Sequence, residues 1–173
     1  MSVLAPLRNL SKMEFYRVAL QLRDALEVWL LKDFATRNNI RDISAKTDPE
    51  IKEKIDELLD ETNHGAIRRC APRWYAEDEQ RYLLGLVRDM IRHIVKANII
   101  YIGPKVRPCD FDLRRNHQTE AITDISALTE EIFEIQNRFP SDLNHTIPLL
   151  ELCEKESDLL EGWKKADAKY APK

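Results

Sequence analysis

The chain has 173 residues, enough for one domain with a substantial core, and its formal net charge at pH 7 is −3. Only four residues are glycine and 33% are charged, a composition that, with apolar residues at helical spacing, favours an all-helical protein. The N-terminus lacks the apolar segment of a signal peptide, and no apolar run reaches the ~18 residues that a membrane helix needs. The three cysteines (Cys70, Cys109 and Cys153) show no paired spacing, so we expect free thiols, a cytoplasmic protein and no membrane.

The first predicted helix begins at a capping box, Ser11-Lys12-Met13-Glu14, and runs to about residue 34 or 35. In such a box the serine and the glutamate satisfy each other's free backbone amides. Besides its core face, this helix carries a second, narrower apolar stripe, formed by Tyr16, Leu20, Leu31 and Phe34. Either the following segment covers that stripe or the stripe contacts another subunit, and the pattern leaves both open.

Residues 37–73 read as an insertion with a short helix over about 49–61. The long helices that follow are predicted over about 76–102, 111–138 and 143–168. Their apolar stripes include three residues that we expect to be buried: Tyr101, Leu113 and Ile147. With short connections and a flexible tail at 169–173, the chain is predicted to form one all-α domain over 1–173. Its expected architecture is an antiparallel up-down-up-down four-helix bundle.

Three polar residues fall on these apolar stripes: Asn98, Gln118 and Glu156. Counting along the fourth helix from the turn at Pro140 places Glu156 level with Gln118. We therefore expect one buried polar layer at one end of the bundle. A lone buried carboxylate is costly, so Arg114 or Arg115 is expected to neutralise Glu156. The layer either fixes the register of the helices or forms a small-ligand pocket.

Charge is distributed unevenly. Residues 62–117 contain 11 basic and 6 acidic residues, net +5, whereas 118–163 contain 2 basic and 11 acidic residues, net −9. The positive candidates are a ladder at i, i+4 and i+8 followed by residues near the second connection and the fourth helix: Arg88, Arg92, Lys96, Lys105, Arg107, Arg114, Arg115, Lys164 and Lys165. They form either a phosphate-binding surface or a solvated charged face, and the acidic region argues against non-specific coating of nucleic acid.

No catalytic motif is visible. The four histidines lack metal-ligand spacing, and the chain has no glycine-rich phosphate loop and no serine elbow. We therefore predict a protein that is not an enzyme, with no metal and no cofactor.

Several segments carry a family resemblance: MEFYRVALQLRDALEVWLLKDF near the start, then KANIIY, DLRRNHQTEAI, FPSDLN and LLEGWKK. Together they resemble the accessory variability determinant proteins, four-helix-bundle proteins encoded with diversity-generating retroelements. That family is related to the bundle proteins of ribosomal RNA intervening sequences. The chain departs from the strongly basic family in its pI near 5.9 and in the insertion at 37–73.

The resemblance implies a non-catalytic homo-oligomer, typically a pentameric ring, that binds the retroelement reverse transcriptase and its template RNA. Such a protein would support mutagenic complementary-DNA synthesis. By position, the family's basic surface corresponds here to Arg88, Arg92, Lys96, Arg114, Arg115, Lys164 and Lys165. The second stripe of the first helix becomes a subunit contact. The alternative is a protein-only interaction module that does not bind nucleic acid, which the acidic pI favours. Ring size, the RNA recognised and the role of 37–73 stay open.

Overall fold

The computed structural model describes residues 10–31, 73–103, 106–139 and 143–172. Four long helices fill these ranges, followed by one short 3-10 helix: α2 (Glu14–Trp29), α5 (Arg73–Ile99), α6 (Pro108–Arg138), α7 (Leu143–Asp167) and η3 (Ala168–Tyr170). No strand occurs within the described ranges, so the predicted all-α four-helix bundle is confirmed. The short helix expected at 49–61 and the residue Lys105 lie outside the described residues.

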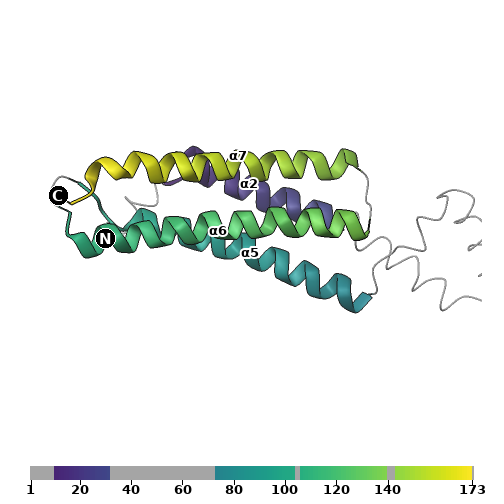
Figure 1. The fold of residues 1–173 in the computed structure, drawn as a ribbon. Coiled ribbons are helices and arrows are strands. Elements are labelled where there is room, and N and C mark those ends of the chain that lie inside the picture. Colours follow the sequence, from purple (N-terminus) through teal and green to yellow (C-terminus); the bar gives the residue numbers. More distant parts are fainter. Residues whose placement is uncertain (1–9, 32–72, 104–105, 140–142, 173) are drawn as a thin grey trace, which may run out of the picture.

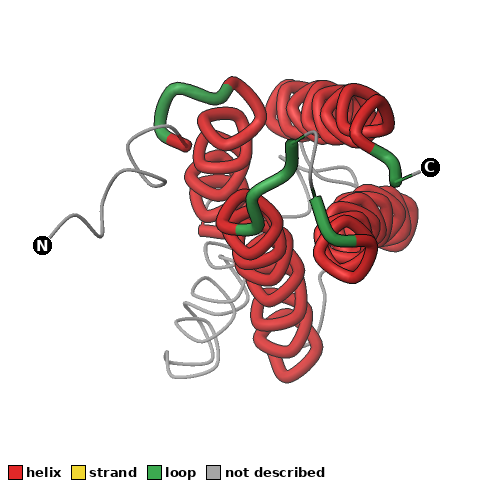
Figure 2. The backbone as a smooth tube through the Cα atoms, turned by 90° about the vertical axis from the view of Figure 1, so that its left-hand side faces the viewer, coloured by secondary structure: helices red, strands yellow, loops and turns green. Residues whose placement is uncertain are grey.

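The helices occupy the corners of a square in chain order. α2 packs against α5 and α7, and α6 packs against the same two helices, with the most extensive contact between α5 and α6. Each helix runs antiparallel to its neighbours in the chain (Figure 1), and the view along the bundle shows the helices surrounding one core (Figure 2). The end of α5, the start of α6 and the end of α7 therefore meet at the same end of the bundle.

The core is built from the apolar stripes that the periodicity predicts. Fully buried side chains come from all four helices, including Leu22 and Leu26 of α2, Met90 of α5 and Ile125 of α6. Burying a leucine-sized side chain stabilises the fold by about 1.5–3 kcal/mol before conformational entropy is counted. The bundle thus rests mainly on aliphatic packing between helices that are marginal on their own.

Helix ends differ from the prediction where capping residues decide them. Met13 is the N-cap residue of α2 and no side chain caps the helix there, so the expected capping box at Ser11 is wrong. α6 begins three residues earlier than expected because Pro108 occupies its first turn, where a missing amide costs nothing. Pro148 lies inside α7, one turn after its start.

Three residues expected in the core are instead exposed. Tyr101 is 80% exposed because α5 ends at Ile99, before the tyrosine can join its stripe. Leu113 and Ile147 are each 49% exposed, since the inward positions beside them belong to Arg114 and Thr146. At both sites a polar side chain has taken the position that hydrophobic periodicity assigned to an aliphatic neighbour.

Thr146 joins three helices through its hydroxyl group. It accepts a hydrogen bond from the Trp29 indole at 3.2 Å and donates one to the Gln136 side chain at 3.3 Å.

We expect Thr146→Val to lower the free energy of unfolding by about 1–2 kcal/mol, because it removes these hydrogen bonds without changing the volume much. Urea unfolding measures the loss. Thr123→Val, on the exposed face of α6, is the control and should change stability by less than about 0.5 kcal/mol.

Candidate functional site

The predicted basic residues lie partly together at one end of the bundle. Arg88, Arg92 and Lys96 are exposed along α5, with Lys96 nearest its C-terminal end. At that same end Arg107 precedes α6, and Lys165 lies in the last turn of α7. The structure therefore places a positively charged edge of α5 next to a basic bundle end, in the arrangement the topology predicts.

Acidic neighbours neutralise part of this surface. Arg92 pairs with Asp89 at 2.6 Å, and Lys165 pairs with Glu161 at 2.9 Å. Arg107 binds Asp110 through two nitrogens, at 2.7 and 2.9 Å. These contacts are solvent-exposed and weak, so a phosphate group could displace them. Lys164 donates to the Thr119 hydroxyl at 2.8 Å, and Arg115 lies 5.8 Å from the Phe111 ring.

Arg114 does not belong to this surface. Its residue is only 8% exposed, and its guanidinium points into the bundle, where Nε donates to Asp167 at 2.7 Å. Its NH1 group donates to the backbone carbonyls of Ala97 and Ile100, at 2.8 and 2.9 Å. The assignment of Arg114 to an RNA-binding surface is therefore wrong, because a buried guanidinium with three acceptors is not available to a phosphate.

Instead, Arg114 is the centre of a buried polar network. Gln118, one turn further along α6, donates its side-chain amide to the same Asp167 oxygen at 2.7 Å. Trp163 of α7 covers the guanidinium, with its ring centroid 4.9 Å from the central carbon, and stacks at 4.4 Å on Phe15 of α2. Side chains or carbonyls of all four helices thus converge at the basic end. The Ala97 carbonyl belongs to the last turn of α5 and also accepts a hydrogen bond from the Ile100 amide, whereas the Ile100 carbonyl lies just beyond the end of the helix.

Glu156 lies elsewhere, and the expected pairing with Arg114 or Arg115 is wrong. Cys153, almost one turn before Glu156, hydrogen-bonds with Thr129 of α6, which places this part of α7 opposite Thr129. Gln118 lies 11 residues before Thr129, or about 16 Å along the helix. Because α6 ends at Arg138 and α7 begins at Leu143, Gln118 lies opposite the end of α7 and not its middle.

The Glu156 carboxyl group lies in the apolar middle of the bundle. Its residue is fully buried, and neither of its oxygens has a hydrogen-bond partner among the described residues. Burial raises the pKa of Glu156 to about 9, and Lys155 opposes this shift only slightly. At neutral pH the side chain is therefore a neutral acid, which is how a lone carboxyl group is tolerated in a hydrocarbon-like core.

The other predicted positions are Asn98 on α5 and the second apolar stripe of the first helix, and they form no shared site among the described residues. Asn98 is half-buried near the end of α5, next to the Ala97 carbonyl that Arg114 contacts. On α2, Tyr16 packs partly against the core, Leu20 is half-buried and Leu31 is 66% exposed, whereas Phe34 lies outside the described residues. The second stripe of α2 is thus partly open to solvent.

A histidine pair between α5 and α6 was not predicted. His93 and His117 stack with ring centroids 5.7 Å apart, and His93 Nδ1 lies 3.2 Å from an Asp124 carboxylate oxygen. Burial, then the nearby His93 and Lys96, lowers the pKa of His117. The antiparallel pairing of α5 with α6 brings the two histidines together, so the pair could be found only by aligning the two predicted helices. The spacing of residues along one helix does not reveal it.

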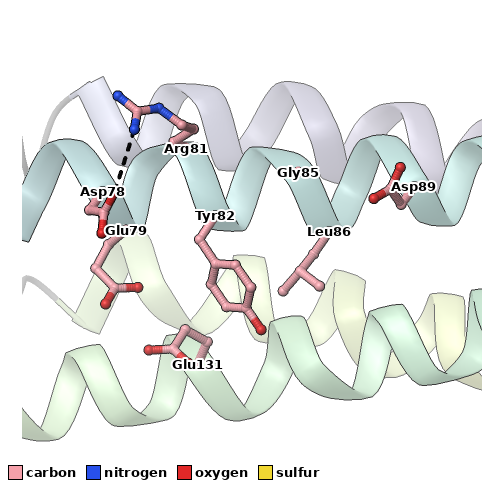
Figure 3. A pocket seen from close by; sticks show the side chains of 8 residues that line it. All are labelled: Asp78, Glu79, Arg81, Tyr82, Gly85, Leu86, Asp89 and Glu131. Carbon is pink, nitrogen blue, oxygen red and sulfur yellow. Dashed lines mark hydrogen bonds and ion pairs between the residues drawn. The ribbon is translucent and has the colours of Figure 1, made fainter.

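A groove between α5 and α6 is lined by several acidic side chains (Figure 3). It has a volume of about 510 Å³, and its lining includes Glu79, Tyr82 and Glu131. Burial, and next the charge of Glu79, raises the pKa of Glu131. Arg81 turns back to Asp78 at 3.5 Å. The groove offers no nucleophile with an activating base, and no set of three metal-ligating side chains occurs among the described residues.

No protein-family model matches this chain, and no curated protein sequence or solved structure matches it. Within the described part of the chain, none of the helices is long and apolar enough to cross a membrane.

The Arg114 network gives a direct test of stability. Arg114→Leu leaves a buried Asp167 carboxylate without its cation and removes the guanidinium donor from the carbonyls of Ala97 and Ile100, so we expect a loss of about 3–5 kcal/mol in unfolding free energy. Guanidinium denaturation followed by circular dichroism measures it. Arg115→Leu, one residue along the same helix, should cost less than about 1 kcal/mol. Equal losses in the two variants would contradict the network.

Glu156 predicts an unusual pH dependence. Between the usual glutamate pKa near 4.5 and the folded value of about 9, the native state holds a proton that the unfolded chain has released. Stability contributed at this site is therefore fully present below about pH 4.5 and falls as pH rises towards 9. We expect Glu156→Gln to gain stability over the wild type by about 1.4 kcal/mol for each pH unit between pH 4.5 and pH 8, with the gain disappearing near pH 4.

Chemical denaturation at several pH values measures this difference. Glu154→Gln, an exposed neighbour on α7, is the matched control and should not show the trend. A gain for Glu156→Gln that is independent of pH would show that the wild-type carboxyl group does not hold its proton across this range.

Proposed function

We propose that this chain is a non-catalytic, oligomeric accessory protein that binds a retroelement reverse transcriptase and its template RNA to support mutagenic cDNA synthesis. The observation that carries the proposal is the exposed row of Arg88, Arg92 and Lys96 on α5, which continues onto the basic end of the bundle. A row of cations at successive helical turns can follow a phosphate backbone. The resemblance of the segments around this row to the retroelement accessory proteins supplies the partner class.

The remaining parts of the proposal follow from the same resemblance. The assembly would be a homo-oligomer, with a pentameric ring as the family expectation, acting in the cytoplasm. The partly open stripe of α2, from Tyr16 to Leu31, is a suitable subunit contact because it presents exposed apolar surface. No metal or cofactor takes part in this role.

The alternative is a protein-only scaffold. Three exposed basic side chains of the candidate surface, Arg92, Arg107 and Lys165, already have carboxylate partners, and the chain as a whole is acidic. An RNA contact must weaken as salt rises because counterions are released from the phosphates, whereas a largely apolar protein contact need not weaken. Salt dependence therefore separates the two functions.

Charge reversal tests the RNA surface. We expect Arg88→Glu combined with Arg92→Glu to weaken binding of the template RNA at least tenfold in a fluorescence anisotropy titration, because two phosphate contacts are replaced by repulsion. The slope of log affinity against log salt should also become shallower. The control is Arg17→Glu, on the exposed face of α2. Unchanged affinity in the double variant would remove this surface and favour the protein-only scaffold.

A further inference from the structure

A groove separate from the basic surface lies between α6 and α7. It has a volume of about 620 Å³ and is open to solvent along the side of the bundle that these two helices share. Its lining consists of twelve residues from the two helices: Ile125, Ser126, Thr129, Glu130, Phe133, Ile147, Leu150, Glu151, Cys153, Glu154, Ser157 and Asp158. No site described above uses this groove.

The bottom and sides of the groove are apolar. Ile125 and Cys153 are fully buried at its base, and Leu150 is half-buried beside them. Phe133 on α6 and Ile147 on α7 are 51% and 49% exposed, so each presents about half of a large apolar side chain to solvent. An aromatic ring and a branched aliphatic side chain on opposite walls are what a helix-in-groove contact requires.

The rim of this groove carries one sign of charge. Four of the lining residues are acidic (Glu130, Glu151, Glu154 and Asp158), all four are exposed, and no basic residue lines the groove. None of these carboxylates forms an ion pair with any residue in the described ranges. Exposed carboxylates around an apolar trough favour a cationic occupant and repel phosphate.

We propose that this groove docks a basic amphipathic helix from a partner protein. Apolar side chains at i, i+3 or i+4, and i+7 of that helix would lie between Phe133 and Ile147, and its lysine and arginine side chains would reach the four carboxylates. The lining along α7 extends from Ile147 to Asp158, about 16 Å, which matches two to three turns of a bound helix. The inference goes beyond the proposed function, because it needs neither RNA nor a reverse transcriptase.

Charge argues against the chain's own predicted helix near 49–61 as the occupant. The predicted helix near 49–61 contains six acidic residues and two lysines, so it would meet the acidic rim with the same sign of charge. RNA is disfavoured for the same reason. A second copy of the chain would have to present a basic apolar helix, and this possibility is one outcome of the test below.

The test uses a fluorescein-labelled peptide of about 14 residues, with leucines on one helical face and lysines elsewhere, long enough to span the groove. A peptide of equal composition, with its leucines spread around the helix, is the reference. We expect the full-length protein to bind the amphipathic peptide at least tenfold more tightly than the reference in anisotropy titrations. Phe133→Ser should weaken that binding about tenfold, as loss of a central apolar anchor does.

A charge variant keeps the proposal testable if Phe133→Ser folds poorly. Glu151→Lys with Glu154→Lys should weaken the amphipathic peptide at least tenfold, whereas Glu27→Lys, exposed on α2, should not. Equal binding of the two peptides, or unchanged binding in both groove variants, would overturn the proposal. So would a native mass that falls in the groove variants, because the groove would then hold a second copy. We expect the groove variants to leave RNA affinity unchanged, and a separate anisotropy titration with RNA measures it.

Discussion

One buried ion pair ties the helices together at the end of the bundle where α5 ends, α6 begins and α7 ends. Arg114 of α6 binds Asp167 of α7 while donating to the carbonyls of Ala97 and Ile100 at the end of α5, and Trp163 covers it from the α7 side. Helix ends are where a bundle frays, since their backbone groups lack partners. Because Arg114 lies near the start of α6 and donates to groups at the ends of α5 and α7, these helix ends cannot fray without breaking buried hydrogen bonds. The stacking of Trp163 on Phe15 extends this link to α2.

Periodicity was sufficient to predict the fold, because four stripes of aliphatic residues joined by short connections leave few alternatives to an antiparallel bundle. It also placed Gln118 and Glu156 on inward faces, and both residues are buried. What it could not resolve was which polar groups meet. That depends on the axial offset between α6 and α7, which is set by where the turn begins and ends, and a shift of six residues moves a side chain by about 9 Å.

Arg114 and Asp167 show why charged residues are the hardest part of such an interpretation. Sequence alone groups Arg114 with the neighbouring basic residues, and it offers Glu156 and not Asp167 as the buried partner of an inward arginine. Asp167 lies four residues after Trp163 and seven after Leu160, on the same inward stripe, and this spacing was the available signal. An acid and a base that each occupy an inward position on facing helices are best read as a pair. The histidines of α5 and α6 illustrate the same point, since only the pairing of the helices brings them together.

The reactivity of the buried Cys153 depends on how often α6 and α7 separate. Burial raises the pKa of its thiol to about 11, so almost none of it is thiolate at neutral pH, and its side chain is fully buried at the base of the groove between α6 and α7. A thiol in this state reacts only when the two helices separate. Cys109, by contrast, is exposed at the start of α6 and reacts without any opening. The rate at which a thiol reagent modifies Cys153 therefore reports how often α6 and α7 separate at this point. The rate for the exposed Cys109 gives the reference value for an accessible thiol in the same molecule.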